Sequence, residues 1–409
     1  MCSPSAIIQG NYSMEGSDMY MVLKGIKLRI YPDSYQKELI EYNFGANRFV
    51  WNNMLDMMIK RHENNPDLKS LKAFDLNYIL TTFKKEHIWL KKAESTSLQA
   101  TDKDLFEAYK GFFSKKRKFP RFKSKKFPKQ SYQCKFINNN IEVLDDSYIK
   151  LPKLGVMKYK NKKWIPSVIK YVTIRKLSTN KYYAVLTVDE ETVQLPKTNK
   201  FVGLDMGVSD LVICSDGSKY KTIRFDKKLA KKKCYWEKRL ARRRTQALKD
   251  IQYKKKFGLI DPKPLEQYSN YMKAKLMVAK YSEKIANQRK DYLHKITREL
   301  VENNDLIVIE DLKTKNLLGN HNLSRAIANQ SWRALRLMLE YKCEWYGKKL
   351  LIVNPFKTSQ ICSNCGYDDG KHGLDIRECD CPNCGIHHDR DINASKNILN
   401  NGLEQALVK

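Results

Sequence analysis

No stretch of this sequence is apolar for long enough to span a membrane. Its uninterrupted apolar runs, such as LIVI at residues 306–309, fall far short of the roughly 20 residues that a transmembrane helix needs. The sequence also has no internal repeat, no low-complexity tract and no glycine loop of the type that holds nucleotide phosphates. These absences disfavour a membrane protein, a repeat architecture and a nucleotide-driven motor.

Acidic residues and histidines are both scarce relative to basic residues. The 409 residues include 77 Lys and Arg, 45 Asp and Glu, and 7 His, which gives a formal net charge of +32. An excess this large repels itself in a compact fold unless a polyanion binds, so we expect nucleic acid as the partner rather than a merely solvated basic surface. No segment has the pattern of a basic amphipathic membrane anchor, and no histidines form an H-E-x-x-H or HNH-type cluster.

The first twenty residues lack the pattern of a secretory signal, and the spacing of the cysteines does not predict a disulfide framework. Residues 1–20 carry Glu15 and Asp18 and lack a basic start and an apolar stretch, so we expect them to form a disordered leader. Five of the ten cysteines lie in one short window, and the others are scattered. This spacing indicates a metal site in a reducing compartment, so we expect a cytoplasmic protein that associates with the nucleoid through DNA.

The clustered cysteines form two C-x-x-C pairs separated by fifteen residues, which is the spacing of a zinc ribbon. The predicted ligands of one Zn2+ are Cys362, Cys365, Cys381 and Cys384. Four thiolates leave no open position on the metal, so this zinc is expected to be structural. Cys379 is expected to be spare, and His387 and His388 are weaker alternatives as ligands.

Hydrophobic periodicity predicts a first domain that joins strands from two places in the chain. An alternating strand at residues 25–31 precedes a helical region at 35–110, and short alternating segments follow at 132–193. We expect the first strand to pair with these later ones and to close a domain into which the helical region is inserted.

A second domain is predicted to begin with the strand FVGLD and a hairpin. Two long helices follow at residues 227–257 and 265–303, and an apolar stripe along the second favours an antiparallel helix pair. The first of these helices is dense in basic residues. It is expected to lie along a phosphate backbone, with a plain solvated face as the alternative.

Residues 110–129, KGFFSKKRKFPRFKSKKFPK, hold ten Lys or Arg and five Phe but no acid. Cations neutralise phosphates and rings stack on bases, so the pattern favours binding of RNA or single-stranded DNA. A flexible basic linker whose Phe residues pack on a neighbour is the alternative. Together with the basic helix, the predicted nucleic-acid contacts are Lys115, Lys116, Arg117, Lys118, Arg121, Lys123, Lys125, Lys126, Arg239, Arg242, Arg243 and Arg244.

Three acids stand where a metal-dependent nuclease needs them. Asp205 ends the strand FVGLD, Glu310 ends the strand DLIVIE, and Asp391 opens the helix INASKNIL. Singly, each is an ordinary cap or surface charge. Together, in so basic a protein, they predict carboxylates that hold Mg2+ against a phosphodiester. Two such ions stabilise both the attacking water and the leaving oxygen, so no Ser, His or Cys nucleophile is needed.

Five segments occur in this order: GLDMGVSDL, EKIANQRKDYLHKITRELV, DLIVIEDL, LEYKCEWYGKKLLIVNPFKTSQICSNCG and HHDRDINASKNIL. Their sequence and order resemble the TnpB family, RNA-guided nucleases that insertion sequences encode and that are related to type V CRISPR effectors. The likeness covers nearly all of residues 22–399. Before residue 201, however, only KLRIYP, NRFVWN and FPRFKSKK match clearly.

The resemblance implies an α/β and β-barrel multidomain protein, in which Asp205, Glu310 and Asp391 match the catalytic acids of a RuvC-type RNase H fold. Asp389 is the alternative to Asp391. The expected boundaries are a disordered leader, 1–20; a wedge-like β-barrel, 21–34 and 125–198; a helical recognition module, 35–124; a RuvC-type nuclease domain, 199–354 and 386–409; and a zinc ribbon, 355–385.

The predicted function is therefore RNA-guided cleavage of double-stranded DNA next to a short target-adjacent motif. It would use two Mg2+, one structural Zn2+ and a guide RNA, with no membrane and no required protein oligomer. The alternatives are a nuclease-inactive RNA-guided regulator, which the three acids disfavour, and a strand-transfer transposase, for which the basic, Phe-rich half is less suited. A plain zinc-ribbon nucleic-acid-binding protein would leave GLDMG and IEDL unexplained.

Overall fold

The computed structural model describes residues 19–68, 71–127, 130–160, 168–258, 263–312, 331–370, 373 and 376–407. All but the last two residues of the predicted leader lie outside this part of the chain. The chain divides into two compact units, an N-terminal unit, Met21–Glu191, and a C-terminal unit that includes Thr192–Lys409. A search of the described helices finds none that is long and apolar enough to cross a membrane.

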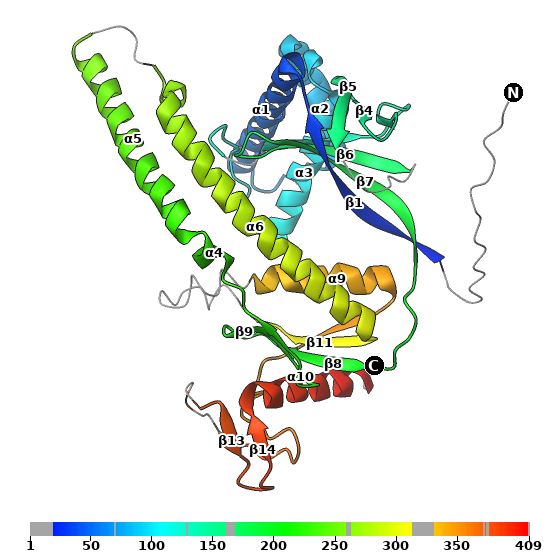
Figure 1. The fold of residues 1–409 in the computed structure, drawn as a ribbon. Coiled ribbons are helices and arrows are strands. Elements are labelled where there is room, and N and C mark those ends of the chain that lie inside the picture. Colours follow the sequence, from blue (N-terminus) through cyan, green and yellow to red (C-terminus); the bar gives the residue numbers. More distant parts are fainter. Residues whose placement is uncertain are drawn as a thin grey trace, which may run out of the picture. The chain divides into compact units, whose positions relative to one another are not determined.

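The N-terminal unit contains a seven-stranded sheet in the order β2-β6-β7-β1-β5-β4-β3 (Figure 1). The strands are β1 (Met19–Tyr31), β2 (Gln130–Lys135), β3 (Glu142–Val143), β4 (Tyr148–Leu151), β5 (Gly155–Lys160), β6 (Ile169–Lys176) and β7 (Tyr182–Val193). Alternate residues of these strands, such as Leu28 and Ile30 of β1, are buried in one core. Strand β1 pairs antiparallel with β5, which confirms that the first strand joins the later ones. Closure of this sheet into a barrel stays a prediction.

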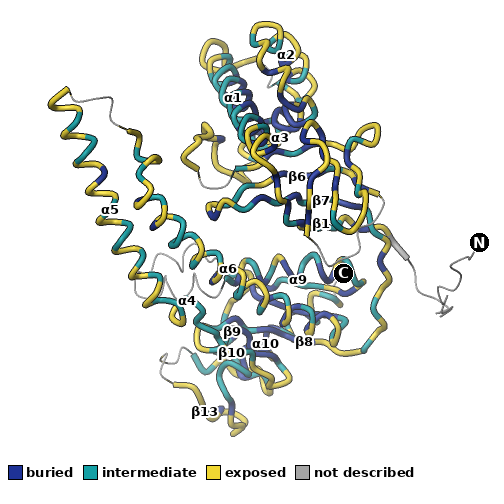
Figure 2. The backbone as a smooth tube through the Cα atoms, turned by 45° about the horizontal axis from the view of Figure 1, so that its top comes forward, coloured by how far each residue is buried: buried dark blue, intermediate teal, exposed yellow. Residues whose placement is uncertain are grey.

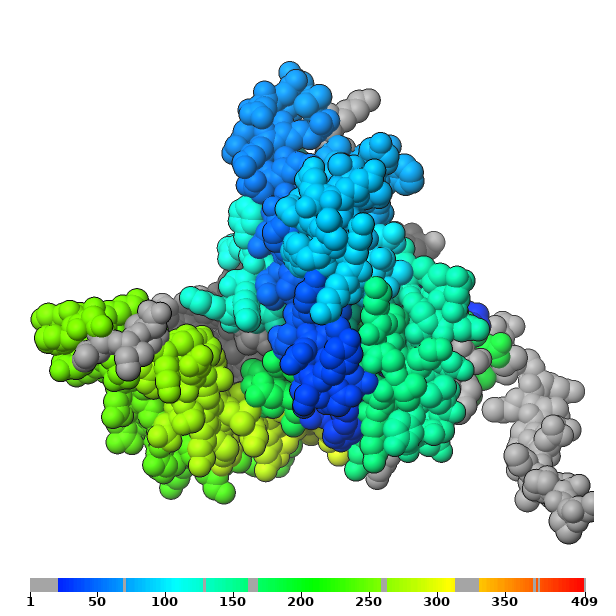
Figure 3. Space-filling view, turned by 90° about the horizontal axis from the view of Figure 1, so that it is seen from above, coloured from blue at the N-terminus to red at the C-terminus, as the bar shows by residue number. Residues whose placement is uncertain are grey.

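Three helices form the rest of the N-terminal unit, namely α1 (Ser34–Asn64), α2 (Ala73–Glu86) and α3 (Ser95–Phe113), with a 3-10 turn η1 (Ile88–Lys92) before α3. Helix α1 begins at Ser34 because Asp33 caps it. The Asp33 carboxylate accepts the Gln36 N–H at 2.7 Å, and the Gln36 side chain accepts the Asp33 N–H at 3.1 Å. The helices bury a core of their own, and Figure 3 shows them, blue to cyan, gathered in one mass.

The C-terminal unit is built on a five-stranded sheet in the order β10-β9-β8-β11-β12. The strands are β8 (Phe201–Asp205), β9 (Asp210–Cys214), β10 (Lys219–Lys221), β11 (Leu306–Glu310) and β12 (Lys349–Val353). Strands β8, β9 and β10 are antiparallel neighbours, whereas β11 runs parallel to both β8 and β12. Because β8 and β11 are parallel, both end at the same edge of the sheet.

Helices cover both faces of this sheet (Figure 1). On one face, α6 (Ser269–Asn303) and α9 (Trp332–Tyr346) pack against the strands in a shared core. On the other, α10 (Arg390–Leu407) packs across β8 and β11. The approach is close at Gly203 of β8, where a Cβ atom would lie 2.2 Å from the Ser395 carbonyl oxygen. Glycine at position 203 therefore sets how near α10 can lie to the strand that carries Asp205.

The two long helices predicted for this unit are confirmed as an antiparallel pair. A short helix α4 (Phe225–Lys228) leads into α5 (Ala230–Lys256), and a 3-10 turn η2 (Leu265–Gln267) precedes α6. The residues of the second helix expected on the apolar stripe include Tyr271, Ala274 and Ile285, all of which are buried. Helix α5 is largely exposed, as its yellow and teal tube in Figure 2 shows, and Ala247 is its buried residue.

Candidate carboxylate and metal-binding site

The three predicted acids meet at one edge of the five-stranded sheet. Asp205 and Glu310 are the last residues of the adjacent parallel strands β8 and β11, whose register pairs Leu204 with Ile309. Asp391 is the second residue of α10, which packs on these strands. The local sequence predicts the positions of Asp205 and Glu310, because apolar residues form each strand and the acid lies where the strand leaves the core. The order of the strands then brings together Asp205 and Glu310, which are 105 positions apart, and Asp391, which is 81 positions after Glu310.

The electrostatics of this edge show that Glu310 and Asp391 both act on Asp205. Burial, followed by the nearby charges of Glu310 and Asp391, raises the pKa of Asp205 to about 7, against a lowering by the Met206 N–H group and by Arg390. Burial also raises the pKa of Glu310, opposed by a hydrogen bond from Thr358. Two neighbouring carboxylates, Asp205 and Glu310, whose pKa values are both raised form the pattern expected where a cation binds.

Asp389 and Asp391 differ in what their carboxylates already bind. Asp389 Oδ1 accepts the backbone N–H groups of Asp391 at 3.0 Å and Ile392 at 3.1 Å, and Oδ2 pairs with the Lys219 ammonium at 2.5 Å. These contacts hold the pKa of Asp389 below its usual value. Asp391 pairs more loosely with the Arg377 guanidinium, at 3.2 Å. Asp389 therefore serves the start of α10, which leaves Asp391 as the better candidate ligand.

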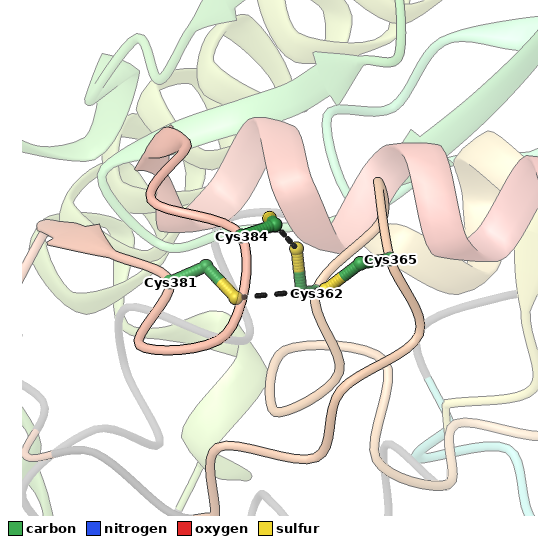
Figure 4. Close-up of side chains that lie close together, drawn as sticks. All are labelled: Cys362, Cys365, Cys381 and Cys384. Atoms are coloured by element: carbon green, nitrogen blue, oxygen red, sulfur yellow. Dashed lines mark hydrogen bonds between the residues drawn. The ribbon is translucent and has the colours of Figure 1, made fainter.

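The four predicted zinc ligands lie together at the ends of two loops. Figure 4 shows Cys362 and Cys365 facing Cys381 and Cys384 beside α10. Their four sulfur atoms all lie within 4.8 Å of one another, and two cross-loop pairs are 3.7 and 3.6 Å apart. Tetrahedral Zn2+ with bonds of about 2.3 Å places its sulfur ligands about 3.8 Å apart, so this geometry fits the metal. Cys379 is outside the group, as predicted.

His388 is not one of the four ligands, but it contacts one of them. Its Nε2 atom lies 3.0 Å from the Cys362 sulfur, and its side chain is buried. His388 belongs to β14 (His387–Asp389), which pairs antiparallel with β13 (Glu378–Asp380) to form the hairpin that carries the second pair of cysteines. The imidazole is thus placed to donate a hydrogen bond to a thiolate, a contact that steadies metal ligands.

Hydrogen bonds also connect the first cysteine loop to the acids. Asn393 and Asn397 of α10 both donate to the Ile361 carbonyl, at 2.8 and 2.6 Å, one residue before Cys362. The Thr358 hydroxyl donates to Glu310 Oε1 at 2.6 Å. Sequence reasoning missed Thr358, Asn393 and Asn397, because nothing local marks a residue whose partner is tens of positions away. The one signal that a sequence offers for such residues is a neutral polar side chain close to a predicted acid or metal ligand.

The basic stretch predicted to bind nucleic acid is exposed and fixed at several points. All eight of its predicted contacts, from Lys115 to Lys126, are exposed. The Trp51 indole donates to the Arg121 carbonyl at 3.0 Å, and Asn52 exchanges two hydrogen bonds with the Lys123 backbone. The Lys123 ammonium also lies 3.7 Å from the Trp51 ring centre. These contacts tie the stretch to α1, in contrast to a free linker.

The Phe residues of this stretch divide into two groups. Phe112 and Phe119 pack edge to face with centroids 5.2 Å apart, and Tyr109 packs on Phe119 at 5.5 Å. Phe122 and Phe127 instead expose 57% and 59% of their surface. Part of the aromatic pattern therefore serves local packing, as the alternative reading expected, and part remains available to stack on bases.

The four arginines predicted on the basic helix also divide. Arg243 donates to the Asn270 carbonyl at 2.8 Å and so connects α5 to α6. Arg239 lies over the rings of Tyr235 and Trp236. Arg242 and Arg244 are exposed. A role in contacting phosphates stays a prediction for all four, and Arg243 has a structural role as well.

The chain combines a mixed α/β sheet with acids at one edge, a four-cysteine site and a large positive charge. These features define its class, the basic α/β proteins with sites of the kind that bind metals. Comparison with known proteins narrows this class. A family profile described as "Probable transposase" matches residues 184–321, a "Cas12f1-like, TNB domain" profile matches 332–398, and a "Helix-turn-helix domain" profile matches 19–66.

Two relatives match along almost the whole chain. A Streptomyces pristinaespiralis protein named as an RNA-guided DNA endonuclease is 31% identical over 391 residues, covering 94% of this chain and 90% of its own. An Escherichia coli K12 protein, also named as an RNA-guided DNA endonuclease, is 32% identical over 394 residues, covering 92% of each. A cryo-EM structure of a Cas12f1–sgRNA–target DNA complex is 18% identical with a TM-score of 0.32, covering 93% of this chain and 99% of that one. The chain belongs to the TnpB family of RNA-guided DNA endonucleases.

Proposed function

We propose that this protein is an RNA-guided DNA endonuclease that hydrolyses phosphodiesters beside a short target-adjacent motif. The observation that carries the proposal is its similarity, along more than nine-tenths of its length, to two proteins named for that activity. The grouping of Asp205, Glu310 and Asp391 at one sheet edge supports it, because the activity needs such a site. The presence of all three acids also favours cleavage over a nuclease-inactive regulator.

The C-terminal unit is proposed to be a RuvC-type nuclease domain of the RNase H fold. The order of its sheet supports this assignment, with three antiparallel strands followed by two parallel ones and helices on both faces. We place the nuclease domain at 199–354 and 386–409 and the zinc ribbon at 355–385. In the N-terminal half, we place a wedge-like barrel at 21–34 and 125–198 and a recognition module at 35–124.

Asp205, Glu310 and Asp391 are proposed to hold two catalytic Mg2+, since carboxylate oxygens are the ligands that this ion prefers. Bound Mg2+ would activate a water and stabilise the oxygen that leaves the phosphodiester. Among the described residues, the four cysteines are the group whose ligand atoms all lie within 4.8 Å of one another.

The chain's own residues organise this site in two ways. Asp205 and Glu310 end adjacent strands whose core holds their backbones in place, so neither acid needs to be ordered when the substrate arrives. Arg377, from the ribbon side, neutralises Asp391 in the protein alone. An incoming cation would compete with Arg377 for that carboxylate.

The guide RNA and target DNA are proposed to bind the exposed cations of the basic stretch and of α5. Their positive charge neutralises phosphates, and the exposed Phe122 and Phe127 can stack on unpaired bases. Sequence choice is then assigned to base pairing between guide and target, while the protein reads only the adjacent motif. A strand-transfer transposase would have no need of an RNA on these surfaces.

The experiment is to purify the protein, sequence the RNA that accompanies it, and compare RNA-stripped with RNA-restored protein on a plasmid library of adjacent motifs. The proposal expects a single structured RNA and cleavage only when it is restored, beside one short motif. Efficient site-specific cutting by RNA-free protein would contradict it and favour an ordinary DNA-reading nuclease or a transposase.

A further inference from the structure

The hydrogen bond from Thr358 to Glu310 joins the zinc-binding segment, residues 355–385, directly to a predicted catalytic acid, as the Arg377–Asp391 pair also does. Thr358 Oγ1 lies 2.6 Å from Glu310 Oε1, and both side chains are more than nine-tenths buried. Within the described part of the chain, Oε1 is the oxygen of Glu310 that accepts a hydrogen bond. The contact therefore fixes the rotation of the carboxylate and leaves Oε2 to another partner.

Thr358 is held in place by α10 on its other side. Asn397 donates to the Thr358 carbonyl at 2.8 Å and, four residues earlier on the same helix face, Asn393 donates to the Ile361 carbonyl at 2.8 Å. The Asn393 side chain also accepts the Ser363 N–H at 2.8 Å. Residues 358–363 are thus bound along α10, the helix whose first turn carries Asp391.

This arrangement continues to the four-cysteine site. Cys362 lies between Ile361 and Ser363, both of which are held by Asn393, and it is itself buried. A metal bound by the cysteines therefore restrains the same short segment that positions Glu310. Thr358 also follows β12 closely in the chain, and the last residue of β12, Val353, lies opposite Glu310 in the sheet.

We propose that Thr358 is a positioning residue for Glu310, and that the zinc-binding segment acts through it to orient a carboxylate for the catalytic cation. The inference rests on the proposed function, since it assigns Glu310 to that site. A single hydroxyl is sufficient, because a bound Oε1 prevents the carboxylate from rotating and presents Oε2 in one direction. The zinc site would thereby contribute to the geometry of a second metal site without contacting its substrate.

The test compares Thr358→Val, which keeps the shape of the side chain but removes the donor, with Thr358→Ser, which keeps the donor. Ser359→Ala serves as the control in the adjacent position. Each full-length protein is assembled with its guide RNA, and three quantities are measured: zinc content, target binding, and Mn2+ binding followed by electron paramagnetic resonance. Cleavage is then measured as a function of Mg2+ concentration, alongside Asp205→Ala.

The inference expects Thr358→Val to need on the order of tenfold more Mn2+ and Mg2+ and to cut on the order of tenfold more slowly at saturation. Zinc content and target binding should be unchanged, and Thr358→Ser and Ser359→Ala should behave like the natural protein. Wild-type metal dependence in Thr358→Val would overturn the inference, as would equal losses in the Val and Ser variants, which would indicate packing. If Asp205→Ala binds Mn2+ and cuts normally, the proposed site itself is wrong.

Discussion

Asp205 is one of 45 acidic residues in a chain with 77 basic ones, and what distinguishes it is its surroundings. Two other carboxylates act on it, and burial together with these charges raises its pKa to about 7. Several exposed acids elsewhere in the described residues are paired with lysine or arginine, as Asp56 is with Lys60. An acid left among acids is stabilised by binding a cation, and a cation is what the proposed chemistry needs.

Replacing Asp205 by Ala should abolish cleavage, because it removes a proposed ligand of the catalytic Mg2+, while guide and target binding should persist. The measurement is cleavage of a matched DNA target in parallel with an electrophoretic binding assay. The matched control is Asp216→Asn, in the β9–β10 turn of the same sheet, where among the described residues the carboxylate accepts hydrogen bonds only from nearby Ser218. Normal cutting by Asp205→Ala would refute the assignment of this acid.

Changing Cys381 to Ser should release zinc and loosen the segment around Cys362, because three thiolates bind the ion much less tightly than four. Changing Cys379 to Ser should leave the zinc content at one ion per chain, since Cys379 is outside the cysteine group. Elemental analysis of both purified proteins checks this. Full zinc occupancy in Cys381→Ser, or loss of zinc from Cys379→Ser, would show that the ligand set is wrong.

Asp102 of α3 is a buried acid with neither carboxylate oxygen hydrogen-bonded. Burial raises its pKa to about 8, against a lowering by Lys84. Because the folded-state pKa is raised, its contribution to stability is fully present below about pH 4 and is lost as pH rises toward 8. Asp102→Asn should remove this loss, which is on the order of a few kcal/mol.

The measurement for Asp102 is the urea midpoint of the wild type and of Asp102→Asn at pH 5 and pH 8. The wild type should lose more stability between these pH values than the variant. Equal pH dependence in both proteins would mean that Asp102 is already ionised in the folded state.

At the scale of elements, the position of α10 depends on how closely it can approach β8. A Cβ atom at Gly203 would lie 2.2 Å from the Ser395 carbonyl oxygen, a backbone atom that cannot rotate away. Gly203→Ala should therefore displace α10, destabilise the C-terminal unit by about 1–3 kcal/mol and move Asp391 away from Asp205. Both the melting temperature and the cleavage rate should fall.

The matched control is Gly25→Ala in β1, where the nearest atom to an added Cβ is a Val185 side-chain carbon at 3.9 Å. This substitution should leave cleavage unchanged. If Gly203→Ala melts and cuts like the natural protein, the close packing of α10 does not position Asp391.

The elements of the site could be predicted from sequence to different extents. Strands β8 and β11 were predictable because apolar runs ending in an acid mark them, and the cysteine spacing identified all four members of the metal-type site. The contact between Thr358 and Glu310 was not predictable, because it joins residues 48 positions apart that only the folded segment after β12 brings together. Similarly, the pairing of Asp389 with Lys219 depends on a sheet edge and not on local pattern.

At the scale of the whole molecule, the net charge of +32 is the feature that two folded units cannot balance on their own. The basic stretch before β2 and the helix α5 present exposed cations, while Asp205, Glu310 and Asp391 lie at one edge of the C-terminal sheet. A long polyanion can neutralise these exposed cations and present one of its phosphodiesters to the three acids. The charge pattern thus fits a protein that is complete only with bound nucleic acid.

The most direct test of this account is to change only the target-matching segment of the guide RNA and to map where the DNA is cut. The account predicts that cleavage moves to the newly matched sequence beside the same short motif, and that Asp205→Ala bound to the same guide reaches that sequence without cutting it. Cleavage that stays at one DNA sequence whatever the guide, or that proceeds without RNA, would contradict the account.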